Sequence, residues 1–182
     1  SADTSDVKEI IIPDSVTKIG EWAFRGMVDL ETVTLGANVE AIGNSAFYGC
    51  PKLKTVYTNE KLISIDRFAF AECTSLGEIN INAAVLSAYA FYDCSSLTTV
   101  KLGKDVAVIG EFAFAGTKVS TFEVHSKNTT FSTKEHGALV YKGEELVLVA
   151  PQYAGTNNAV TLDATSIADG AFAGNVKIFR VV

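Results

Sequence analysis

The dipeptide Ala-Phe recurs six times along this chain at nearly constant spacing. The pairs lie at residues 23–24, 46–47, 69–70, 90–91, 113–114 and 171–172. Successive pairs are 23, 23, 21, 23 and 58 residues apart. A period of this length is typical of a solenoid, in which each unit buries its apolar face against the next unit. We therefore predict an elongated stack of coils rather than a globule around one pocket.

Each repeat begins with a short block whose apolar residues keep fixed positions, as in Leu30-x-x-Val33-x-Leu35. Equivalent blocks begin at Val7, Leu53, Leu76, Leu97 and Val119. The second half of the block alternates between apolar and polar residues, which predicts a short strand. Equivalent strands of successive coils should pair in parallel.

The rest of each repeat contains a polar turn, a second apolar pair such as Val39 with Ile42, and a returning segment such as residues 43–50. Its alanine allows close backbone approach and its phenylalanine fills the coil, while the polar positions favour a short helical or 3-10 turn. The predicted fold is a repeat solenoid of α/β type, with short parallel strands on one face and these turns on the other. It forms a single domain, residues 1–182, of about six repeats of about 23 residues.

The interval between the last two Ala-Phe pairs exceeds one 23-residue repeat by 35 residues, which predicts an insertion at about 125–158. Within it, the apolar runs 138–141 and 145–149 flank a Lys-Gly-Glu turn, the signature of a β-hairpin. Two interpretations stay open. The hairpin is either a flap that packs against the flank of the solenoid or one wall of a ligand site.

All three cysteines, Cys50, Cys73 and Cys94, stand three residues after the phenylalanine of their repeat. The same position holds Met27, Thr117 and Asn175 in the other repeats. A position that accepts Cys, Met and Thr is typical of a small, mostly apolar core site, so we expect buried free thiols. A disulfide between neighbouring coils is a second possibility, and a metal site fits worst because a straight ladder does not make a tetrahedron.

Composition argues against several classes of function. A net charge of −6 disfavours general affinity for nucleic acid or anionic membranes. No apolar run is long enough to be inserted across a membrane. The two histidines, His125 and His136, lie in or beside the insertion, away from the cysteine positions, and none of the common hydrolase or phosphate-binding motifs occurs. We therefore predict no catalytic residues, no metal and no cofactor.

Two columns of surface residues could bind a partner. Outward positions of the predicted strands are rich in threonine, which reflects strand propensity or else a shallow polar groove centred on Tyr57, Asn80 and Lys101. The candidate binding residues are Thr34, Thr55, Tyr57, Glu78, Asn80, Thr99, Lys101 and Glu123. The second column is Trp22, Ser45, Phe68, Tyr89 and Phe112. Its aromatic rings form either a semi-exposed stripe or edge-to-face contacts between coils.

The unit Ile-Gly-x-x-Ala-Phe-x-x-Cys-x-x-Leu-x-x-Val, intact over residues 42–56, strongly resembles the BspA-like leucine-rich repeat. The resemblance covers about residues 7–124 and 159–182. The first and last repeats depart from it by lacking the cysteine, as does the fifth with Thr117, and Leu86-Ser87 replaces Ile-Gly in the fourth. The resemblance implies a right-handed leucine-rich repeat solenoid, typical of secreted or surface-anchored proteins, some of which are associated with adhesion to extracellular-matrix proteins.

These observations lead to two hypotheses about function. The first is a non-catalytic, extracytoplasmic recognition or adhesion module, secreted or on the cell surface, that binds a protein or surface glycan through the solenoid face. The alternative is a structural spacer or stalk fragment of a longer surface protein, suggested by a chain that starts and stops within a repeat.

Overall fold

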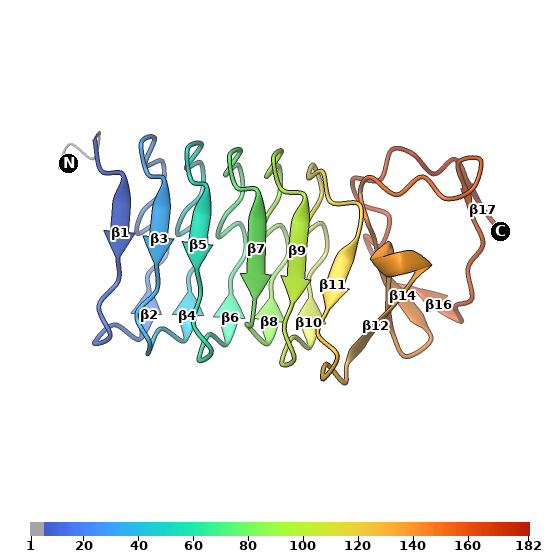
Figure 1. Ribbon diagram of the computed structural model, residues 1–182, viewed down its shortest axis with the longest axis horizontal. Helices are drawn as coiled ribbons and strands as arrows, with labels where there is room; N and C mark the ends of the chain where they lie inside the picture. The colour runs from blue at the N-terminus through green and yellow to red at the C-terminus, as the bar shows by residue number, and fades with distance from the viewer. Residues whose placement is uncertain (1–5) are drawn as a thin grey trace.

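The computed structural model describes residues 6–182, which form a row of stacked coils with the two termini at opposite ends (Figure 1). Each of the first five coils carries two strands on opposite sides. The first strands are β1 (Glu9–Ile11), β3 (Thr32–Thr34), β5 (Thr55–Tyr57), β7 (Glu78–Ile81) and β9 (Thr99–Leu102), and β11 (Phe122–Val124) continues their row. The second strands are β2 (Lys18–Ile19), β4 (Ala41–Ile42), β6 (Ser64–Ile65), β8 (Val85–Leu86) and β10 (Val108–Ile109).

Equivalent residues of successive coils pair in parallel, as the repeat spacing predicts. Val33 of β3 is opposite Val56 of β5, and Ile79 of β7 is opposite Val100 of β9. The first strands make two three-stranded sheets, whereas the second strands make one continuous five-stranded sheet. The sequence did not predict this second sheet, because strands of two residues are too short to show a period of two.

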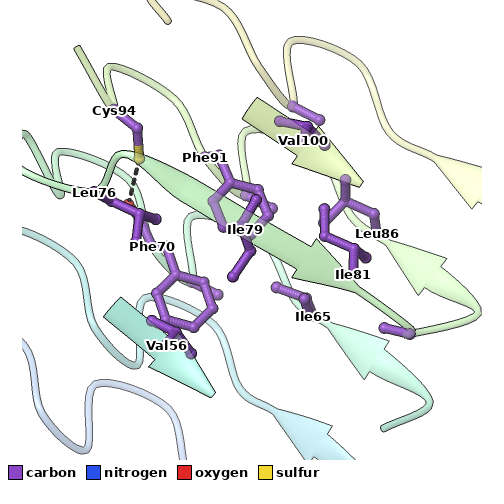
Figure 2. Packing of buried hydrophobic residues seen from close by; sticks show 14 of the residues in the cluster. Val56, Ile65, Phe70, Leu76, Ile79, Ile81, Leu86, Phe91, Cys94 and Val100 are labelled. Atoms are coloured by element: carbon purple, nitrogen blue, oxygen red, sulfur yellow. Dashed lines mark hydrogen bonds between the residues drawn. The ribbon is translucent and has the colours of Figure 1, made fainter. Parts of the chain in front are cut away.

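The core is a file of stacked phenylalanine rings along the axis of the solenoid. Centroids of successive rings are 5.1–5.6 Å apart, with interplanar angles of 3–18°. The phenylalanine file comprises Phe24, Phe47, Phe70, Phe91 and Phe114. Leu, Ile and Val side chains from both rows of strands close around it (Figure 2). The predicted in-register interior stack is confirmed.

The helical or 3-10 turns predicted beside the Ala-Phe pairs are not confirmed. In the second coil, every other N–H closes a local turn, as Ala46 N–H does onto the carbonyl of Gly43. The N–H groups between them donate to the next coil instead, as Phe47 does to Ala69 at 2.8 Å. Because half the donors serve the neighbouring coil, and Ser45 is left-handed with φ +53°, no continuous helix forms. The one short 3-10 helix within residues 6–182, η1 (Glu135–Gly137), lies in the insertion.

The three cysteines are buried free thiols, as expected from their position in the repeat. The sulfur of Cys94 lies 3.1 Å from the carbonyl oxygen of Phe70 in the preceding coil, to which it donates (Figure 2). Cys50 and Cys73 make the same bond to Phe24 and Phe47. A small residue with a weak donor therefore suits this position.

We expect the Cys94 thiol to make stability depend on alkaline pH. Burial raises the pKa of this thiol to about 12, whereas an unfolded cysteine titrates near pH 8.5–9. Above that pH the unfolded chain releases a proton that the folded chain retains, so stability falls as pH rises toward 12. Between pH 8 and 10 the free energy of unfolding should drop by roughly 1.5–2 kcal/mol more in the parent chain than in Cys94→Ala, measured by urea unfolding. Equal drops would contradict this assignment.

The insertion is built into the stack rather than lying as a flap on its flank. It forms an antiparallel meander of β12 (Phe131–Lys134), β13 (Leu139–Lys142) and β14 (Glu145–Val149), and the last two strands are the predicted hairpin. β14 then pairs in parallel with β16 (Ser166–Ile167) of the last coil, while β15 (Ala159–Val160) pairs with β17 (Arg180–Val181).

The meander divides the apolar interior into two clusters. Val140 and Leu148 close the cluster that contains the phenylalanine file. Tyr141 and Leu146 belong to a second cluster under the last coil, where Phe172 packs instead of continuing the file. The β13–β14 hairpin thus contributes side chains to both apolar clusters.

Three partly buried asparagines hold the turns that follow the strands. Asn128 donates from its amide nitrogen to the carbonyls of Gly103 and Val106, and its oxygen accepts from the backbone N–H groups of Thr130 and Phe131. Asn59 and Asn175 make the same kind of bridge to the preceding turn. The coil that begins with β11 therefore keeps the regular repeat structure as far as Asn128. The chain departs from that structure only after this residue.

Candidate binding surface

The outer faces of β3, β5, β7, β9 and β11 carry all eight candidate residues, and we call this surface the strand face. Its residues line up across the coils: Thr34 is opposite Tyr57, and Asn80 is opposite Lys101, which is itself opposite Glu123. Thr34, Thr55, Thr99 and Lys101 are half-buried, whereas Tyr57, Glu78, Asn80 and Glu123 are exposed. The ladder register therefore gathers residues about 23 positions apart onto one polar surface.

A shallow hollow of about 390 Å³ lies on the strand face at the carboxyl ends of β7, β9 and β11. It brings together Asn80, Lys101 and Glu123 from the candidate set. Asn82 and His125, which follow two of these strands, complete its polar lining and were missed from the sequence. Tyr57, placed at the centre of the predicted groove, lies outside the hollow with 59% of its surface exposed.

Charged residues on the strand face form exposed ion pairs between neighbouring coils. Lys101 Nζ lies 2.7 Å from Glu78 Oε1, and this hydrogen bond raises the pKa of the lysine. Lys54 and Glu31 pair at the same distance. Exposed pairs of this kind add little to stability, because water screens both charges. They instead leave charges of both signs available to a partner.

The second surface column is a half-buried stripe in which the rings stack face to face. Phe68, Tyr89 and Phe112 stack nearly parallel, with centroids 4.9 and 5.0 Å apart and interplanar angles of 23° and 4°, so edge-to-face packing within the column is wrong. The Arg67 guanidinium lies 5.0 Å from the Tyr89 centroid and covers this stack. Trp22 is separated from the stack by Ser45 and remains 57% exposed. We call the full set, with Gly170 at the equivalent position of the last repeat, the aromatic column.

The family model of the BspA type leucine rich repeat region matches the chain in six copies, over residues 2–88 and 83–135. The chain belongs to this family. No curated protein matches it in sequence.

Solved structures of bacterial leucine-rich repeat proteins share this BspA-type fold. A leucine-rich repeat protein from Eubacterium ventriosum superposes with a TM-score of 0.86 at 21% identity, over 99% of this chain and 48% of that one. A leucine rich cell surface protein from Faecalibacterium prausnitzii gives 0.60 at 22% identity, over 96% and 54%. The pneumococcal vaccine antigen PcpA gives 0.64 at 21%, over 96% and 45%. The chain spans about half the length of these proteins.

Close coil contact explains the glycine of the BspA-type motif. A Cβ on Gly110 would lie 2.3 Å from the backbone nitrogen of Ala88 in the preceding coil, a separation that no side chain tolerates. At Gly43 the same atom would meet backbone at 2.9 Å. Glycine is therefore required in these two coils, whereas Asp66, Ser87 and Ala168 hold the equivalent position in other repeats, where the coils leave room for a side chain.

Neither histidine of this BspA-type chain lies in an enclosed site. His125 and His136 are exposed, and His125 accepts a hydrogen bond at Nδ1 from the N–H of Lys127. Within residues 6–182, no cluster of three or more His, Cys, Asp or Glu side chains could hold a metal ion. The same part of the chain has no helix of the length and apolarity that crossing a membrane requires.

Proposed function

We propose that this chain is a non-catalytic recognition or adhesion module that binds a protein or a surface glycan through the strand face. The observation that supports this most is the in-register polar surface around the hollow at Asn80, Lys101 and Glu123. It offers amide, ammonium and carboxylate groups within one shallow concavity. Tyr57 adds an exposed aromatic side chain, a type enriched in protein interfaces.

The proposed location is outside the cytoplasm, either secreted or on the cell surface. Support comes from membership of the BspA-type family and from similarly folded proteins described as a cell surface protein and as a vaccine antigen. Three free cysteines fit either a reducing or an oxidising compartment here, because burial keeps them from pairing.

Binding to immobilised host matrix proteins and bacterial surface components, followed by biolayer interferometry, tests the proposal. For any ligand found, Lys101→Ala and Tyr57→Ala should each weaken binding about tenfold, in the range of interface residues that cost more than 1 kcal/mol. Ile63→Ser is the matched control, because Ile63 is exposed and directly precedes β6, on the side formed by β2, β4, β6, β8 and β10 that we call the short-strand side. Its affinity should equal that of the parent chain.

Two results would contradict the proposal. A folded sample that binds none of these ligands would favour the spacer or stalk role instead. Equal weakening by Ile63→Ser and Lys101→Ala would move the binding surface away from the strand face.

A further inference from the structure

A cleft of about 600 Å³ lies on the short-strand side, opposite the strand face, where the meander enters the stack. One wall is β10, the edge strand of the five-stranded sheet, and the other is β14. Tyr89, Phe112 and Gly170 of the aromatic column also line it. The volume falls within the range of small-molecule sites.

The aromatic column ends at this cleft with one ring face uncovered. Tyr89 is sandwiched between Phe68 and Phe112, whereas Phe112 stacks on Tyr89 with one face only. The next position, two residues before Phe172, is Gly170. The outer face of the Phe112 ring therefore meets the space that a further side chain of the column would occupy.

Gly170 keeps the backbone of the column although it has no side chain. Its φ is +69°, and the five preceding members, Trp22 to Phe112, have φ between +53° and +60°. A Cβ on Gly170 would meet nothing closer than 3.4 Å, an ordinary contact. The space beside Phe112 thus results from the missing side chain and not from a different chain path.

The rim of the cleft is polar and carries both signs of charge. Glu111, Glu145 and Asp169 supply carboxylates, and Arg67 and Lys142 supply cationic donors. None of these five residues takes part in an ion pair of 4.0 Å or less within the described chain. Carboxylate and guanidinium groups can each bond two adjacent hydroxyls at once.

We propose that this cleft binds a pyranose ring of a glycan. The ring stacks its C–H face on Phe112, where partially positive C–H bonds meet the negative face of the aromatic ring. The hydroxyls at its edge bond the carboxylates of Glu111 and Asp169. A wholly aromatic ligand would make no hydrogen bond to these exposed carboxylates, whereas sugar hydroxyls can donate to them, so the mixed lining favours a sugar. This site is separate from the strand face and does not depend on its function.

Saturation-transfer NMR with the methyl glycosides of glucose, galactose, mannose and N-acetylglucosamine tests the proposal. At least one should bind, with a dissociation constant of about 1 mM, as expected for a ligand of this size. Its ring C–H protons should receive the strongest transfer. Gly170→Phe should abolish the signal by completing the column, and Phe112→Ala should weaken binding at least tenfold by removing the platform.

The matched control is Gly49→Phe, which adds the same side chain at a left-handed position, φ +66°, with open space around its Cβ and away from the cleft. It should bind like the parent chain. If Gly170→Phe does not fold by circular dichroism, Glu111→Gln with Asp169→Asn replaces it and should weaken binding at least tenfold.

Three outcomes would overturn the proposal. The first is no binding of any of the four glycosides at about ten times the expected dissociation constant. The second is sugar binding that survives Gly170→Phe but is lost in Lys101→Ala, which would place the sugar on the strand face. The third is stronger transfer to a tyrosine-containing peptide that displaces the sugar, which would make the cleft a peptide site.

Discussion

Replacing Phe70 by alanine should lower the free energy of unfolding by about 3–5 kcal/mol. Phe70 is fully buried at the centre of the phenylalanine file, 5.1 Å from the Phe47 ring and 5.3 Å from the Phe91 ring. Its removal leaves a ring-sized cavity that stacked coils cannot close, because ladder hydrogen bonds on both sides fix their spacing. A loss of this size is a large fraction of the stability of a typical domain.

Urea unfolding followed by circular dichroism measures this loss, and two variants control for position. Phe24→Ala removes the same ring from the end of the file, where it is only half-buried, and should cost less than Phe70→Ala. Thr99→Ala on the strand face should cost well under about 1 kcal/mol. Equal losses of unfolding free energy for Phe70→Ala and Thr99→Ala would contradict the assignment of Phe70 to the interior and Thr99 to the surface.

Replacing Asn128 by alanine should cost about 2–6 kcal/mol. Its side chain makes four hydrogen bonds to backbone groups, each contributing roughly 0.5–1.5 kcal/mol net. The bonds tie the last regular turn, at Gly103 and Val106, to the start of β12. Their loss should therefore loosen the junction where the meander leaves the solenoid, besides lowering overall stability.

Thermal unfolding and amide hydrogen exchange of residues 128–142 measure the two effects. Asn38→Ala is the matched control, since the half-buried Asn38 side chain makes only exposed hydrogen bonds, to Asp14 O and Lys61 Nζ, and it should cost under about 1 kcal/mol. Asn128→Asp keeps the acceptor but brings a carboxylate to two carbonyls, so it should be no better than alanine. Full stability in either Asn128 variant would show that the turn holds without the bridge.

The repeat features that depend on a single side chain and its spacing could be predicted from the sequence. The file from Phe24 to Phe114, the buried cysteines and the strand face all follow from one rule, since residues 21–23 apart meet across adjacent coils. The β13–β14 hairpin was predictable for a similar reason. The turn depends on Gly143 itself, whose φ is positive. Its flanking strands are four and five residues long, enough for their apolar runs to be recognised in the sequence.

Other features depend on competition between groups that spacing does not reveal. Polar residues around Ala46 favour a helical turn, but the N–H of Phe47 gains a partner in the next coil, and the helix is lost. Tyr89 and Phe112 stack in parallel from left-handed backbone, which costs a non-glycine residue about 1–2 kcal/mol and has no sequence signature in aromatic residues. In the sequence Asn128 resembles an ordinary loop residue. Its hydrogen bonds to the carbonyls of Gly103 and Val106 depend on how the preceding turn packs in the folded chain.

The sequence by itself determined that this chain stacks coils and which residues face inward, because a regular period leaves equivalent side chains only one set of neighbours. Only the tertiary structure decided how the insertion joins that stack. β14 enters beside the last coil, ends the phenylalanine file at Phe114 and opens the cleft next to Gly170. The insertion interrupts the period, so its contacts are set by which surfaces pack best in three dimensions, and no spacing in the sequence records that choice.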